Sequence, residues 1–266
     1  MSATNVNAPA PENPELVIRK LSDKITIFSA PFARFGLIPI GGRSTAIKLD
    51  DGSLWIVAST ALTPSTLSTL QEMSTGGPGV RHLIAIDREH NMFVPQYAKA
   101  FPDAKLYVPT GVKENWDKAG GDKKQLSDKV AFVFGQGQGD PFDSVTNGEI
   151  KSIDFGKSHG NEDIAFLHTP TKTLIQADLM FNLPPTEQYS KSSKRSWFPL
   201  LSSQFTADGA GHKRLLNMIA KDKTEYSKCA KAVSAWDFDA IIPCHGEVIT
   251  TGGKGIWNNL YAKFLK

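Results

Sequence analysis

Short hydrophobic runs bounded by turn residues fill the first part of the chain. Runs of this length, rich in β-branched residues, are typical of β-strands. The turn Asp50-Asp51-Gly52 joins two of them and indicates a hairpin. The pattern therefore predicts a β-meander, with strands at Leu16–Arg19, Ile25–Ser29, Thr45–Leu49 and Leu54–Val57.

The hydrophobic period changes after Thr63-Pro64, a pair suited to begin a helix. Leucines follow at helical spacing until Gly76-Gly77 ends the run. The chain then alternates between the two kinds of element, with a strand at His82–Ile86, a helix from about Pro95 to Phe101 and a strand at Leu106–Val108. Such alternation predicts a layered α/β architecture.

The rest of the chain shows strands first and helices afterwards. Residues 111–143 indicate a helix and then a loop, and the glycine run Gly135–Gly139 is interpreted as a turn, because it lacks the GxGxxG spacing and the Lys-Ser/Thr pair of phosphate-binding loops. We expect strands at Ile150–Phe155, Ile164–His168, Thr173–Gln176 and Ala240–Pro243, and helices at His212–Ala220, Glu225–Trp236 and Ile256–Leu265.

The composition is that of one globular domain. Of the 266 residues, 40% are hydrophobic and 21% are charged, which is enough to build one substantial core. Residues 1–14 are rich in Pro, Asn and Ala and cannot sustain a helix. We therefore predict a flexible tail at 1–14 and a single domain at 15–266.

The net charge of +3 is too small to imply a polyanionic partner, so no nucleic acid is expected. No window approaches the roughly 20 apolar residues that span a membrane, and residues 1–13 do not resemble a secretory signal. The two cysteines, Cys229 and Cys244, form no CxxC pair, which favours a reducing compartment. We therefore expect a small-molecule ligand and a cytoplasmic location. The sequence leaves the oligomeric state undetermined.

Four potential metal ligands follow predicted strands or lie in loops: His90, His159, Asp178 and His245. Loops at strand ends bring side chains together from distant parts of a sequence. Imidazoles with a carboxylate suit one divalent metal, Zn²⁺ first, with Fe or Mn as alternatives. Each residue alone also has a simpler interpretation as a hydrogen-bonded loop side chain.

Three segments resemble motifs of the metallo-β-lactamase superfamily. Gln176–Phe181 is similar to its T-G-D-x-x-F element, Pro243–Glu247 to its G-H-G element, and Lys157–Asn161 to its G-H-T-x-G loop. The resemblance implies an αββα four-layer sandwich. It also implies His159, Asp178 and His245 as metal ligands.

The superfamily's H-x-H-x-D-H element should follow the strand that ends at Ile86, but the chain has Asp87-Arg88-Glu89-His90-Asn91-Met92 there. Only His90 is retained, so the resemblance implies at most one good metal site. The Gly41–Thr45 and Asp51–Trp55 segments, with this altered loop, resemble more specifically the DUF4336 group of the superfamily, over roughly Leu16 to Glu247.

The first functional hypothesis is a metal-dependent hydrolase of a small ester, lactone, amide or thioester. A single metal lowers the pKa of a bound water and prepares it for attack on a carbonyl. Asp178, Glu89 and Asp87 are the candidate catalytic carboxylates. The alternatives are a non-catalytic binding protein that has lost its metal, and iron-based redox chemistry at the same site.

Two further residues are candidates for substrate binding, Arg43 through a substrate carboxylate and Tyr189 through the pocket wall. Cys244 precedes His245 directly, and neighbouring strand residues point to opposite faces, so we interpret it as a small buried residue and not as a nucleophile. His82 and His168 lie in strand patterns and are expected in the core or on a sheet surface.

Overall fold

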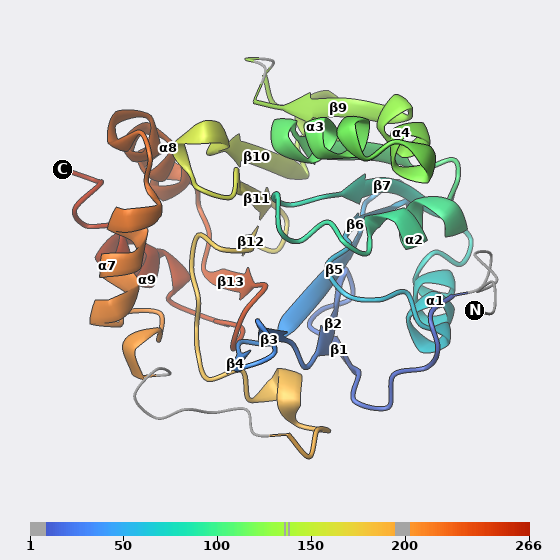
Figure 1. Cartoon of the computed structure of the whole chain (residues 1–266), viewed down its shortest axis with the longest axis horizontal. Coiled ribbons are helices and arrows are strands. Elements are labelled where there is room, and N and C mark those ends of the chain that lie inside the picture. The colour runs from blue at the N-terminus through green and yellow to red at the C-terminus, as the bar shows by residue number, and fades with distance from the viewer. Residues whose placement is uncertain (1–8, 136, 138, 195–202) are drawn as a thin grey trace.

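The computed structural model describes residues 9–135, 137, 139–194 and 203–266, and all structural statements below concern these residues. Two β-sheets pack face to face, and helices cover the outer face of each sheet (Figure 1). The result is an αββα four-layer sandwich. This arrangement confirms the fold class predicted from the sequence.

The first sheet has seven strands in the order β1-β2-β5-β6-β7-β8-β9. Its first half is antiparallel, whereas β6 to β9 pair in parallel. Parallel neighbours require crossover connections, and helices supply them here. The strands are β1 (Val17–Lys20), β2 (Ile25–Ala30), β5 (Gly42–Lys48), β6 (Leu54–Val57), β7 (Val80–Ile84), β8 (Lys105–Pro109) and β9 (Val130–Phe134).

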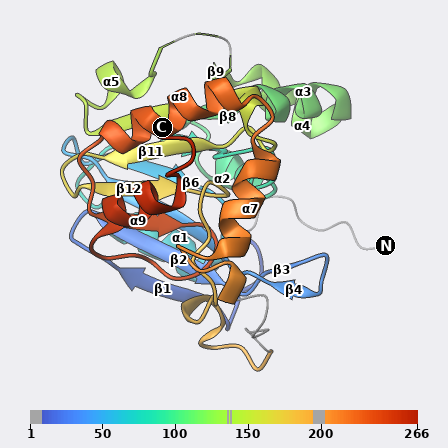
Figure 2. The same cartoon turned by 90° about the vertical axis from the view of Figure 1, so that its left-hand side faces the viewer.

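The second sheet has the order β10-β11-β12-β13, and its last pair is parallel. Its strands are β10 (Ile150–Asp154), β11 (Ile164–His168), β12 (Thr173–Gln176) and β13 (Ala240–Pro243). A separate hairpin of β3 (Ala33–Arg34) and β4 (Ile38–Pro39) projects from the body of the molecule near α7 (Figure 2).

The helices form the two outer layers. Thr63 caps α1 as predicted, because its hydroxyl accepts a hydrogen bond from the backbone N–H of Thr66. The first sheet carries α1 (Pro64–Met73), α2 (Val94–Ala100), α3 (Thr110–Ala119) and α4 (Gly121–Asp128). The second carries α7 (Ala210–Ile219), α8 (Lys223–Ala235) and α9 (Gly253–Leu260); short turns are α5 (Phe142–Val145), η1 (Gly156–Ser158) and η2 (Glu187–Tyr189).

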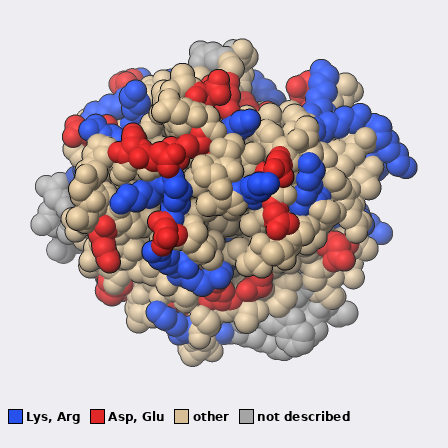
Figure 3. All heavy atoms as spheres, turned by 180° about the vertical axis from the view of Figure 1, so that it is seen from behind, with Lys and Arg blue, Asp and Glu red and all other residues tan. Residues whose placement is uncertain are grey.

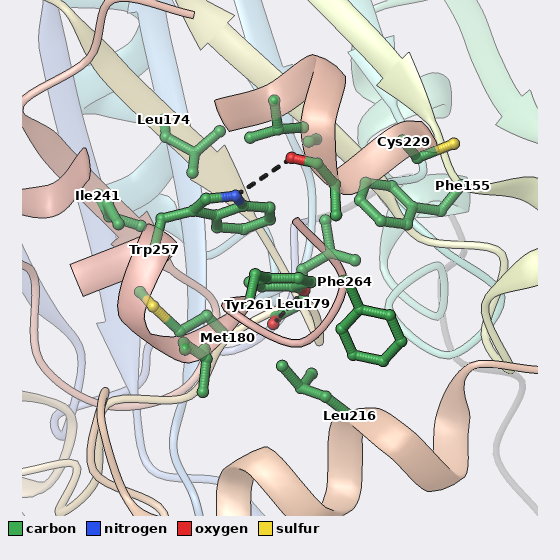
Figure 4. Close-up of a cluster of buried hydrophobic side chains, with 14 of the residues drawn as sticks. Phe155, Leu174, Leu179, Met180, Leu216, Cys229, Ile241, Trp257, Tyr261 and Phe264 are labelled. Atoms are coloured by element: carbon green, nitrogen blue, oxygen red, sulfur yellow. Dashed lines mark hydrogen bonds between the residues drawn. The ribbon is translucent and has the colours of Figure 1, made fainter. Parts of the chain in front are cut away.

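Three hydrophobic clusters hold the four layers together. The one between the sheets is centred on Trp55, which makes edge-to-face contacts with Phe142 and Phe166. The one beneath α7, α8 and α9 contains Trp257, whose indole N–H donates to the carbonyl of Ala230 (Figure 4). The two sheets therefore share one continuous buried layer.

Several elements differ from the sequence prediction. Residues 111–143 contain two helices, strand β9 and the short α5 where only a helix and a loop were expected, and the β3–β4 hairpin was not predicted. Residues 1–8 of the predicted tail lie outside the described part of the chain. Within its remainder, Ala10 N–H donates to the carbonyl of Leu62.

Charged side chains of both signs are interspersed over most of the face shown in Figure 3. Among the described helices, none is long and apolar enough to cross a membrane.

Candidate metal centre

The candidate centre lies where loops leave the ends of β7, β12 and β13. Gln176 of β12 pairs in parallel register with Pro243 of β13. Asp178 and His245 each follow two residues later, so the register places these two side chains side by side. The loop after β7 brings His90 to the same end of the sandwich.

His90 and His245 face each other with their Nε2 atoms 2.9 Å apart. The Nδ1 atom of His245 lies 2.6 Å from the carbonyl oxygen of Gly41, which only accepts hydrogen bonds, so this Nδ1 carries the proton. The Nδ1 atom of His90 lies 2.7 Å from a carboxylate oxygen of Asp87 and is likewise the donor. Two neutral rings held in this way direct two Nε2 lone pairs at each other.

Such an arrangement requires a positive charge at the two Nε2 atoms. Burial opposes protonation of His90, but the charges of Asp87, Cys244 and Asp178 outweigh it and hold the pKa of His90 well above its ordinary value. A metal ion meets the same need, since two imidazole nitrogens on a tetrahedral zinc lie about 3.3 Å apart. Hydrogen bonds from the Nδ1 atoms are the usual support of metal-binding histidines.

Asp178 supplies a free carboxylate oxygen beside this pair. Its Oδ2 accepts a hydrogen bond from the amide of Asn161, whereas its buried Oδ1 has no hydrogen-bond partner among the described residues and lies 3.3 Å from Nε2 of His245. Burial raises the pKa of Asp178, but the charges of His90 and His245 outweigh this and lower it below the ordinary value. The carboxylate is therefore ionised and available.

Asp163 supports Asp178, because its carboxylate accepts a hydrogen bond from the backbone N–H of Asp178. Burial, with the charges of Asp87 and Asp178, raises the pKa of Asp163 well above its ordinary value. Neither Asp163 nor Asn161 was singled out by sequence reasoning. Their side chains act through Asp178. Asn161 lies in the segment Lys157–Asn161, but the resemblance marks only His159 there.

Cys244 also belongs to the centre. Its Sγ and the ring nitrogens of His90 and His245 lie within 4.8 Å of one another. Burial raises the pKa of Cys244, but the two neighbouring histidines outweigh it and lower the pKa to about 7. The side chain is buried as predicted, yet the argument from strand alternation was wrong, because β13 ends at Pro243 and Cys244 already lies in the turn beyond it.

His159 lies deeper, stacked against Tyr226. Its Nδ1 accepts the backbone N–H of Asn161, and its buried Nε2 has no hydrogen-bond partner among the described residues. Burial lowers its pKa to about 4, so the ring is neutral. Two groups of potential ligands have their ligand atoms within 4.8 Å of one another: His90 with Cys244 and His245, and Asp87 with His90 and Asp178. His159 belongs to neither group, and its role as a ligand stays a prediction.

Asp87 and Glu89 have different surroundings. Asp87 has no exposed surface; its Oδ1 accepts the backbone N–H groups of Glu89 and His90, and its Oδ2 holds the His90 ring. The geometry thus makes Asp87 a positioning residue for His90. Glu89 is exposed at the edge of a cavity of about 320 Å³ that reaches His90 and His245.

Arg43 is 1% exposed and lies beneath the centre, not in the cavity. Its guanidinium donates to the carbonyl of Pro243, at 2.6 Å, and to the hydroxyl of Ser29, and it pairs with Glu187 at 3.4 Å. These contacts support the end of β13. Tyr189 donates its hydroxyl to the carbonyl of Phe32 and so supports the cavity wall; substrate contacts of either residue stay predictions.

Two other histidines are structural. His82 and His168 are both buried, and the first contacts the hydroxyl of Tyr107 while the second contacts that of Thr171. Burial lowers the pKa of each ring to about 4. Their predicted place in the core is confirmed.

The fold is that of the metallo-β-lactamases. Over 95% of this chain and 99% of theirs, it superposes on DIM-1 metallo-beta-lactamase exposed to ceftazidime (13% identity, TM-score 0.57) and on VMB-1 at pH 5.5 (13%, 0.58). It also superposes on FIM-1 from Pseudomonas aeruginosa in its mono-zinc form (11%, 0.55, over 99% and 100%). These identities show a common fold only.

The chain belongs to the DUF4336 family, described as a domain of unknown function, whose sequence profile matches residues 35–204. This confirms the resemblance found in the sequence. Comparison with curated protein sequences gave no match.

Proposed function

We propose that this protein is a metal-dependent hydrolase with one divalent metal held by His90, His245 and Cys244. The observation that carries the proposal is the pair of Nε2 atoms 2.9 Å apart, with both rings oriented through Nδ1. Two imidazoles and one thiolate are a donor set that suits zinc and leaves a fourth position open. A metal so held lowers the pKa of bound water and polarises a carbonyl group.

The chain's own residues complete the site. Asp178 Oδ1, ionised and without a hydrogen-bond partner among the described residues, orients a water molecule next to His245, while Asn161 fixes the other carboxylate oxygen. Asp87 holds His90 in the orientation that aims Nε2 inward. The substrates that fit this chemistry are small esters, lactones, amides or thioesters.

Metal analysis of the tag-free protein tests the proposal. We expect about one equivalent of metal in the wild type, and less than about a tenth in His245→Ala. His82→Gln, which alters a buried histidine outside the centre, serves as the control and should keep its metal. Cobalt substitution should add a thiolate-to-metal absorption band in the near ultraviolet, and Cys244→Ser should lack it.

A hydrolysis assay distinguishes an enzyme from a non-catalytic binding protein. The metal-loaded protein should hydrolyse at least one member of a panel of p-nitrophenyl esters, thioesters and lactones, and His245→Ala should not. Wild-type protein that retains no metal after incubation with Zn, Fe or Mn would overturn the proposal and leave a non-catalytic binding module. If the metal-loaded protein hydrolyses none of these compounds but shows redox activity, the centre is a redox site and not a hydrolytic one.

A further inference from the structure

A second cavity, of about 400 Å³, shares Arg34 and Phe35 of the β3–β4 hairpin with the first cavity. Its walls are almost entirely apolar, and its polar groups are Arg34, Asn161 and Asp178. The lining thus combines the carboxylate of the candidate centre with one guanidinium and an apolar surface. Its apolar members include Phe35 of the hairpin and Leu215 of α7.

Arg34 lines both cavities and has no anionic partner in the described part of the chain. Among the described residues it makes no ion pair, and its guanidinium lies 5.2 Å from the ring centre of Phe35. Arginine is a preferred binder of carboxylates, since its planar donors match the two oxygens. Arg43, the arginine that the sequence suggested for this task, has its donors engaged elsewhere.

Phe35 lies at the tip of the hairpin in a costly conformation. Phe35 and Gly36 have φ values of 54° and 71°, and the N–H of Leu37 donates to the carbonyl of Arg34, as in a type I′ turn. A non-glycine residue in the left-handed region is strained, because its Cβ approaches the following carbonyl oxygen. The ring is 80% exposed, so the free protein gains little from placing a phenylalanine here.

From these observations we infer that the substrate carries a carboxylate and an apolar body, which bind at Arg34 and in the 400 Å³ cavity. The scissile carbonyl then lies toward Asp178 and the centre, and the Phe35 ring covers the apolar body. The cavity volume falls within the range of small-molecule sites. The inference rests on the proposed function for the reaction, but the binding itself does not require the metal.

Binding of two matched probes tests the inference. By titration calorimetry, 4-phenylbutanoate should bind the wild type about tenfold more tightly than 4-phenylbutanamide, because only the acid pairs with Arg34. Arg34→Gln should abolish this preference. Arg214→Gln, an exposed arginine on α7 that does not line the cavity, is the matched control and should retain it.

The apolar wall has its own pair of variants. Leu215→Asn, inside the cavity, should weaken both probes severalfold and keep the preference for the acid, whereas Met218→Asn, 69% exposed on the same helix, should change neither. All variants should show the wild-type circular dichroism spectrum.

The titrations are made on metal-stripped and zinc-loaded protein. Preference for the acid in both forms supports Arg34 as the anchor, whether or not the centre proves catalytic. Preference that appears only with zinc would show that the carboxylate binds the metal, and this would overturn the inference. Retention of the preference in Arg34→Gln would overturn it as well, while loss of metal binding alone would count only against the proposed function.

Discussion

The Nε2 atoms of His90 and His245 lie 2.9 Å apart, and each ring is held in place by a hydrogen bond at Nδ1. The two supports differ. His245 is held by a backbone carbonyl, that of Gly41, whereas His90 is held by the side chain of Asp87. Only the second support can be changed by a substitution without moving the backbone.

Asp87→Asn should therefore weaken metal binding without removing a proposed ligand. The amide oxygen of the new side chain must still accept the backbone N–H groups of Glu89 and His90, so the amide nitrogen faces the His90 ring. This nitrogen cannot accept a hydrogen bond from the Nδ1–H group, and the ring loses its orientation. We expect a 10–100-fold weaker zinc affinity, measured by competition with a chromophoric chelator. Glu89→Gln, on the exposed neighbouring side chain, should bind zinc as the wild type does; an unchanged affinity in Asp87→Asn would contradict the positioning role.

Arg43→Gln should destabilise the fold. The substitution leaves the carbonyl of Pro243 and the hydroxyl of Ser29 without a buried donor and removes one partner of Glu187. Breaking a buried pair of this kind costs about 3–5 kcal/mol, which urea unfolding would measure. Arg81→Gln, at an exposed position of β7, should stay within about 0.5 kcal/mol of the wild type. A stable Arg43→Gln protein that loses ligand affinity would instead favour a substrate role.

His168 should make the fold sensitive to mild acid. Burial is the first cause of its lowered pKa, about 4 in the folded protein, and the charge of Lys24 lowers it further. The unfolded chain, with a histidine pKa near 6.5, binds the proton more readily. The contribution of the neutral ring to the free energy of unfolding is therefore fully present above about pH 6.5. It is lost as the pH falls from about 6.5 toward 4.

His168→Gln isolates this contribution. Between pH 7 and pH 5 the variant should lose about 1–2 kcal/mol less unfolding free energy than the wild type, as measured by urea titration at each pH. Lys151→Gln, at an exposed position of the adjacent strand β10, should show the wild-type pH dependence. Equal slopes in wild type and His168→Gln would show that the ring does not titrate differently on unfolding.

Local sequence patterns were sufficient to predict most of the scaffold. Strand β12 and strand β13 are short buried runs, and the motif residues Asp178 and His245 follow each run at the same interval. Parallel pairing then fixes their proximity. The sequence can thus indicate which residues follow a strand end, and the register of the paired strands then brings their side chains together.

The remaining features depend on contacts that no local pattern records. The β3–β4 hairpin has two-residue strands, which are too short for a hydrophobic period. Cys244 joins the centre because the chain turns after Pro243, and Gly41 contributes a carbonyl, which any residue carries. Arg34 and Arg43 could not be ranked from sequence, since only burial shows which guanidinium is engaged.

Trp55→Ala should destabilise both sheets together. The indole lies between them, 0% exposed, in edge-to-face contact with Phe142 from α5 and Phe166 from β11. Removing it leaves a large cavity in the shared layer and should cost about 3–5 kcal/mol. Because the layer is common, residues 15–266 should unfold as one unit, which stays a prediction until measured.

Hydrogen exchange at rising urea concentrations measures this for each sheet. Amides of β5, in the first sheet, and of β12, in the second, should lose protection at the same urea concentration in the wild type, and Trp55→Ala should lower both midpoints equally. Met92→Ala, 61% exposed, should lower neither. Separate midpoints, or a shift confined to one sheet, would mean that each sheet with its helices folds independently, and the single domain would have to be divided.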